Sequence, residues 1–119
     1  MNWGLSEGNI AKIRAILARH PEVEKAVLYG SRAKGNYRHG SDIDLTLFGE
    51  GLDWRKCATI AAELDDSSIP YRVDLSVFAL LSHVGLREHI ERVGVVLFDR
   101  DVWDAEQTAA RAARKGAEG

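Results

Sequence analysis

Two segments of the chain alternate apolar and polar residues, which is the pattern of a β-strand with one buried face. DIDLTLF (residues 42–48) places its isoleucine and two leucines on one face and Asp42 and Asp44 on the other. YRVDLSVF (residues 71–78) separates its residues in the same way and places Asp74 on the polar face. The sequence therefore predicts two strands that each carry carboxylates away from the core.

Amphipathic segments before, between and after these strands predict helices. Residues 9–20 repeat isoleucine and leucine at helical spacing, with Ser6 as the N-cap, and residues 86–93 show the same periodicity. Residues 53–65 predict a helix that is capped by Asp53. Its expected apolar face consists of Trp54, Cys57, Ala58, Ala61 and Leu64.

Two short apolar runs, AVLYG (residues 26–30) and VVLF (residues 95–98), predict buried strands. Residues 31–41 predict a loop. Helices and strands then alternate along the chain, which favours an α/β or α+β fold with a sheet covered by helices. The 119 residues suffice for one domain, expected at residues 1–100, followed by an Ala-rich peripheral helix or frayed tail at residues 101–119.

Composition restricts the compartment and the partners. A net charge of -2 and a pI near 6.1 give no overall basic footprint, so we expect no direct nucleic-acid binding. Cys57 is the only cysteine, which excludes an internal disulfide and favours a reducing compartment. The first residues lack a basic region followed by a continuous apolar run, and no run of about 18 apolar residues occurs, so we expect a cytoplasmic protein without a membrane partner.

The Asp-x-Asp pair is the first candidate for chemistry. Side chains at positions i and i+2 of a strand project about 7 Å apart on one face, so Asp42 and Asp44 are able to share hard cations such as Mg²⁺ or Mn²⁺. Asp74 would complete a three-carboxylate site if its strand lies beside theirs. The alternative is structural: an exposed strand face on which Asp42 merely ends a turn.

A glycine-serine pair precedes the carboxylates and is a candidate phosphate site. Gly30 and Ser31 follow a predicted strand, where a tight turn lets backbone N–H groups approach phosphate oxygens. Arg32 and Lys34 add positive charge to the same segment. The spacing is not that of a P-loop, because Asn36 stands where a P-loop has lysine.

Together these residues resemble a known signature. GSRAKGNYRHGSDIDL resembles the nucleotidyltransferase motif of the DNA polymerase beta superfamily, in which Gly-Ser, ten residues and Asp-x-Asp follow one another. VDLSVF supplies the later third aspartate, and the short chain resembles the minimal nucleotidyltransferase (MNT) proteins of that superfamily. The resemblance extends from the first predicted helix to about residue 98.

The resemblance implies a nucleotidyltransferase fold, a small mixed sheet flanked by helices, with Mg-ATP between the Gly-Ser turn and the aspartates. By position, Gly30 and Ser31 would hold the triphosphate, and the nucleotide site would also include Arg32, Lys34 and Ser41. The resemblance implies that Asp42 and Asp44 bind metal. It implies that Asp74 binds the catalytic metal and helps to deprotonate the acceptor hydroxyl.

The resemblance also implies a partner. MNT proteins are encoded beside helical HEPN-type proteins, often RNase toxins, and form complexes with them. We therefore expect transfer of AMP from ATP to a hydroxyl, expected to be that of a tyrosine, on a HEPN-type toxin, with this chain as antitoxin. Two alternatives stay open: a nucleotide-binding subunit that neutralises or supports its partner without catalysis, and a small-molecule nucleotidyltransferase with a separate substrate-binding subunit.

Overall fold

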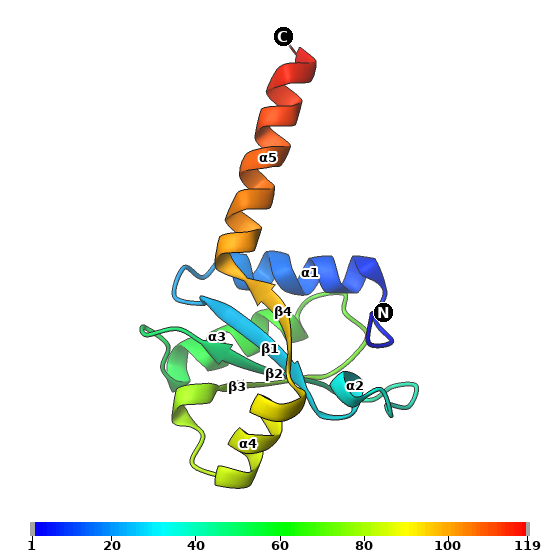
Figure 1. The fold of residues 1–119 in the computed structure, drawn as a ribbon, viewed down its shortest axis with the longest axis vertical. Helices are drawn as coiled ribbons and strands as arrows, with labels where there is room; N and C mark the ends of the chain where they lie inside the picture. Colours follow the sequence, from blue (N-terminus) through cyan, green and yellow to red (C-terminus); the bar gives the residue numbers. More distant parts are fainter. Residues whose placement is uncertain (1, 119) are drawn as a thin grey trace.

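A mixed four-stranded sheet forms the centre of the molecule (Figure 1). The computed structural model describes residues 2–118. The spatial order of the strands is β3-β2-β1-β4; β1 is antiparallel to both β2 and β4, and β2 is parallel to β3. The strands are β1 (Lys25–Tyr29), β2 (Ile43–Phe48), β3 (Val73–Val77) and β4 (Val95–Asp99). This arrangement confirms the predicted fold class.

Helices cover both faces of the sheet. The main core lies between one face and the helices α1 (Glu7–Ala18) and α3 (Trp54–Asp65), whereas α4 (Val84–Val93) packs on the opposite face through Ile90. The remaining helices are α2 (Gly30–Lys34), the 3₁₀ helix η1 (Phe78–Leu80) and α5 (Arg100–Glu118). The prediction of a loop over residues 31–41 was therefore wrong at its start, because the chain turns directly from β1 into α2.

Local sequence signals explain where the two long core helices begin. The Ser6 hydroxyl accepts a hydrogen bond from the backbone N–H of Asn9, and Asp53 caps α3 in the same way. The predicted apolar face of α3 was wrong in part. Trp54 is 67% exposed, and the buried residues are Ile60 and Leu64, because the face of the helix that packs on β3 begins at the half-buried Cys57.

The alternation of β2 and β3 places apolar and polar residues as predicted. Ile43, Leu45 and Leu47 are fully buried against α1 and α3. Asp44 and Thr46 lie on the opposite face of the sheet, which α4 covers in part. The polar face thus meets a smaller helical layer, and its carboxylates stay within reach of solvent.

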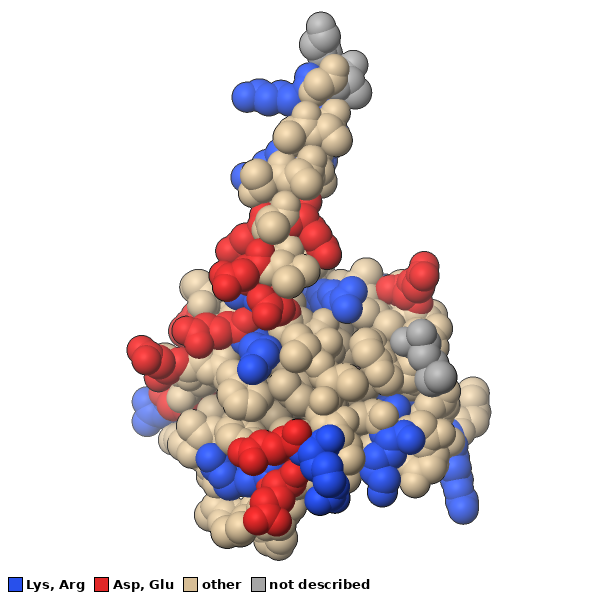
Figure 2. Space-filling view, in the orientation of Figure 1, with Lys and Arg blue, Asp and Glu red and all other residues tan. Residues whose placement is uncertain are grey.

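The C-terminal helix α5 extends away from the body of the molecule (Figure 1), which gives the chain extents of 54 × 33 × 28 Å. Only its first turn is held to the body, where Phe98 and Trp103 pack together. Acidic residues lie near the body and basic residues lie toward the tip (Figure 2). No helix among residues 2–118 is long and apolar enough to span a membrane.

Arg100 joins α5 to the body and is expected to contribute to stability. Its guanidinium donates hydrogen bonds to the carbonyl oxygens of Ala18, His20 and Val23 at 2.7 to 3.2 Å. Replacing Arg100 by Ala leaves these carbonyls without their donor, so we expect a loss of about 2–3 kcal/mol in the free energy of unfolding. Urea unfolding would measure it.

Arg111 provides the matched control, because it lies on the exposed part of α5. Arg111→Ala is expected to change the free energy of unfolding by no more than about 0.5 kcal/mol. Equal effects from the two substitutions would show that Arg100 contributes only surface charge.

Candidate active site

The three predicted catalytic aspartates lie at one end of the sheet. Asp44 of β2 and Asp74 of β3 are direct register partners on parallel strands, and Asp42 immediately precedes β2. Tyr29, the last residue of β1, is the partner of Asp44 on the other side. The strand of Asp74 thus lies beside that of Asp42 and Asp44, which is the condition for a three-carboxylate site, and the end of β1 brings the Gly-Ser turn to the same place.

Gly30 lies against the Asp44 carboxylate. Its φ is +75°, a conformation that favours glycine, and a Cβ at this position would be 2.3 Å from Asp44 Oδ2. The turn therefore requires glycine for two reasons: its backbone conformation and its contact with the carboxylate. Any ligand of Asp44 would consequently lie beside the backbone of Gly30 and Ser31.

The surroundings of Asp44 disfavour its ionised form. Burial raises the pKa of this carboxyl group, and repulsion from Asp74 and Asp42 raises it further, while His89 and Arg32 act in the opposite direction. Two neighbouring carboxylates thus disfavour the charged form of Asp44. A bound cation would relieve this repulsion.

The donor set suits a hard divalent cation. Asp42, Asp44 and Asp74 offer only carboxylate oxygens, the ligands that Mg²⁺ and Mn²⁺ prefer. The side chains are not drawn into one preformed cluster, however: within residues 2–118, no group of three or more His, Cys, Asp or Glu side chains is placed to hold a metal ion. The residues fit such an ion by their chemistry and by the repulsion at Asp44.

A hydroxyl network below the carboxylates was not predicted from the sequence. Tyr29 is buried, and its hydroxyl interacts with Ser76, which donates to the Thr46 hydroxyl at 2.9 Å. Burial raises the pKa of Tyr29, the interaction with Ser76 opposes this rise, and Asp44 and Asp74 add smaller increases. The signal available was the alternation itself, which places Thr46 and Ser76 two residues after the aspartates.

His89 lies on α4, and the packing of this helix brings it to the site. Its ring lies edge-on to that of Tyr29, with 6.3 Å between centroids, and its charge lowers the pKa of Asp44. Only the packing of α4 on the sheet reveals this placement.

The predicted nucleotide-binding residues differ in their placement. Ser31 is half-buried at the start of α2, a helix whose N-cap residue, Tyr29, forms no side-chain capping hydrogen bond. Lys34 is exposed at the end of α2. The Ser41 hydroxyl accepts a hydrogen bond from the Arg38 backbone at 2.8 Å and so shapes its own loop.

Arg32 departs from the prediction of direct nucleotide contact. It is 2% exposed, and its guanidinium donates to the carbonyl oxygens of Ser41 and Trp3. A side chain that is buried and bonded in this way does not present its N–H groups to a ligand at the surface. The structure therefore removes Arg32 from the set of exposed phosphate contacts.

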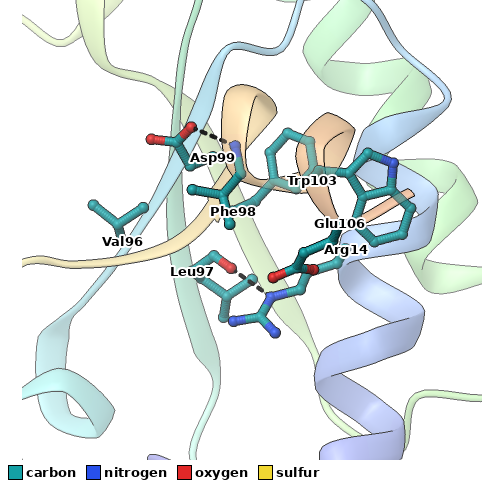
Figure 3. Close-up of a pocket in the computed structure, with 8 residues that line it drawn as sticks. Arg14, Val96, Leu97, Phe98, Asp99, Trp103 and Glu106 are labelled. Atoms are coloured by element: carbon teal, nitrogen blue, oxygen red, sulfur yellow. Dashed lines mark hydrogen bonds between the residues drawn. The ribbon is translucent and has the colours of Figure 1, made fainter. Parts of the chain in front are cut away.

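A pocket between α1, β4 and α5 lies apart from the aspartates (Figure 3). Arg14 donates through Nε to the Leu97 carbonyl oxygen at 2.7 Å, and Asp99 accepts hydrogen bonds from the first backbone N–H groups of α5. These contacts satisfy the edge of β4 and the start of the helix. The pocket is thus explained by how α5 is joined to the sheet.

Comparisons with known proteins agree with this geometry. Residues 11–102 match the family model described as Polymerase beta, Nucleotidyltransferase. A curated relative is the Haemophilus influenzae protein named "Probable protein adenylyltransferase MntA", which is 34% identical over 82 residues, or 68% of this chain and 71% of the relative.

Solved structures share the fold. A toxin-antitoxin crystal structure with AMP-PNP matches with a TM-score of 0.63 and 25% identity, covering 96% of this chain and 92% of the other. A complex of a tri-AMPylated Shewanella oneidensis HEPN toxin with MNT antitoxin matches with a TM-score of 0.62 at 23% identity and the same coverage. On the strength of the family match and of the curated relative, this chain belongs to the polymerase beta nucleotidyltransferase family.

Proposed function

We propose that this protein is a Mg²⁺-dependent nucleotidyltransferase that transfers AMP from ATP to a tyrosine hydroxyl of a HEPN-type toxin and thereby acts as its antitoxin. The observation that carries the proposal is the site itself: the Gly30 turn lies against Asp44, and Asp44 is in register with Asp74. A backbone turn suited to phosphate and carboxylates suited to a divalent cation therefore lie side by side, which supports the proposal.

The comparisons support the reaction and the partner. The curated relative carries the name of a protein adenylyltransferase, and the matched structure with AMP-PNP is a toxin-antitoxin. The HEPN class of partner rests on the signature and on the complex in which a similar fold is found. A partner would also supply the acceptor, since all the predicted site residues lie in a single small domain.

The chain's own residues have distinct tasks in the proposed reaction. The backbone of Gly30 and Ser31 holds the triphosphate, with Lys34 adding charge from the exposed end of α2. Asp74 accepts the proton of the acceptor hydroxyl, whose oxygen forms a bond to the α-phosphorus as the bond to pyrophosphate breaks. Transfer in this form consumes ATP and releases pyrophosphate.

Asp42, Asp44 and Asp74 would hold the divalent cation. When bound, the cation supplies Lewis-acid stabilisation of the charge that develops on the transferring phosphoryl group. We place the catalytic domain in residues 1–100, because every site residue lies there. Residues 101–119 would form a peripheral helix. The proposed compartment is the cytoplasm.

The proposal is tested by label transfer. The purified protein is incubated with the HEPN-type protein encoded beside it, MgCl₂ and ATP labelled at the α-phosphate. We expect label on a tyrosine of the partner with wild type and none with Asp42→Ala/Asp44→Ala. Label that appears equally with both proteins would contradict the assignment of the site.

The same experiment separates the alternatives. Neutralisation of the toxin by the Asp42→Ala/Asp44→Ala variant, without label, would favour inhibition by complex formation. Label that is found only on an added small hydroxyl compound would favour a small-molecule nucleotidyltransferase.

A further inference from the structure

Arg32 is the largest fully buried side chain among the described residues, and it is a cation. Its Nε and Nη2 donate to the Ser41 carbonyl oxygen at 3.1 and 2.7 Å, and its Nη1 donates to the Trp3 carbonyl oxygen at 3.0 Å. The guanidinium also lies 4.6 Å from the centre of the Tyr71 ring and 5.3 Å from that of Tyr37. One side chain thus joins the N-terminus to the peptide before Asp42.

The N-terminal turn that Arg32 holds has an unusual backbone. Trp3 is the only non-glycine residue with positive φ in the described chain (57°), and Gly4 follows with φ of 75°. A Cβ on Gly4 would lie 2.4 Å from the Tyr37 ring and 3.0 Å from Arg32 Nη1. A left-handed conformation at tryptophan is costly and persists only where its surroundings fix it.

Burial of a cation is also costly unless its N–H groups are bonded. Within residues 2–118 Arg32 forms no ion pair with a carboxylate; its partners are backbone carbonyls and two aromatic rings. All three of its nitrogens donate, because two reach one carbonyl and the third reaches another. A lysine would keep the charge but would not reproduce this arrangement.

We propose that Arg32 is a positioning residue of the active site: together with the N-terminal turn, residues 2–5, it fixes the Ser41 peptide and through it the Asp42 carboxylate. The inference rests on the proposed function and extends it, since it makes the N-terminus part of the catalytic arrangement. Asp42 lies one residue before β2 and is exposed, so the sheet alone does not fix its position.

The first test compares Arg32→Gln and Arg32→Lys with wild type. Displacement of a catalytic group by about 1 Å costs roughly 10²-fold in rate, so we expect kcat per folded molecule to fall about 10- to 100-fold in both variants, with little change in KM for ATP. A direct phosphate contact predicts instead that KM rises, and a role of charge alone predicts that Arg32→Lys restores the rate.

The second test leaves Arg32 in place and moves the turn. Gly4→Ala drives a methyl group into Tyr37, whereas Gly8→Ala, the matched control, meets no atom closer than 3.9 Å. We expect Gly4→Ala to lower kcat and Gly8→Ala to leave it unchanged. Wild-type kcat in folded Gly4→Ala and Arg32→Gln would overturn the proposal.

Hydrogen exchange provides a readout that does not depend on catalysis. Amides of residues 36–42 are expected to exchange at least about tenfold faster in Gly4→Ala and Arg32→Gln than in wild type and Gly8→Ala, since the loop opens locally once it is released. Unchanged exchange would contradict the proposed fixation of the loop. If wild type transferred no label while these rates differed as expected, the proposed function would fail and the fixation of the loop would stand.

Discussion

Replacing Asp44 by Asn is expected to lower AMP transfer by about 10³-fold or more while the melting temperature stays the same or rises. The expected loss of activity follows from removal of the central carboxylate of the proposed cation site. The unchanged or increased stability follows from the environment of Asp44, which disfavours its charge in the free protein.

The sign of the stability effect follows from linkage. The pKa of Asp44 is raised in the folded protein, first by burial and then by Asp74 and Asp42. The favourable contribution of such a group is complete below its unfolded pKa and is lost as pH rises through its folded pKa. At neutral pH the ionised group therefore costs stability, and Asn removes that cost.

Thermal unfolding with and without Mg²⁺ would measure this, with Asp65→Asn, at the exposed end of α3, as the control. Mg²⁺ should raise the melting temperature of wild type and of Asp65→Asn but not that of Asp44→Asn, because a ligand stabilises only the state that binds it. An Asp44→Asn protein that melts well below wild type without Mg²⁺ would show that the carboxylate has a structural role instead.

Gly30→Ala is expected to produce the second large effect: loss of both activity and stability. The added methyl group meets Asp44 Oδ2 at 2.3 Å, and alanine at φ of +75° is strained. Backbone strain alone costs about 1–2 kcal/mol. Displacement of the carboxylate adds a loss of about 10²-fold in transfer.

Gly35→Ala separates the two causes. Gly35 has φ of +87°, and no atom lies within 4 Å of the position of an added Cβ, so the substitution introduces strain without collision. Urea unfolding and label transfer should show a similar cost of strain in both variants but loss of transfer in Gly30→Ala alone. Equal loss of transfer in Gly30→Ala and Gly35→Ala would mean that backbone strain in this segment, and not the contact of residue 30 with Asp44, limits the reaction.

The sequence was sufficient for the carboxylates and the strands that carry them, because alternation determines the face on which each side chain lies. It was also sufficient for the Gly-Ser turn, because a glycine at the end of a strand indicates a tight turn with positive φ. The assignment of catalytic and nucleotide-binding roles to these residues remains a prediction.

Other features depend on packing between distant segments and were not visible in the sequence. From the sequence, Arg32 is expected to be a surface cation, whereas in the structure it donates to the carbonyl oxygens of Trp3 and Ser41. The sequence around His89 does not indicate a contact with Tyr29, whereas the packing of α4 on the sheet places its ring beside that of Tyr29. In each case the partner is remote along the chain, and local periodicity carries no information about it.

The parallel pairing of β2 with β3 also has a consequence for the order of assembly. Asp44 and Asp74 become neighbours only after α3 has crossed from one strand to the next, and nonlocal pairing of this kind forms slowly. A newly made chain should therefore lack cation affinity until its strands are paired. Under the proposed function, uptake of Mg²⁺ during refolding would report the pairing of β2 with β3, and a chain without this pair would not consume ATP.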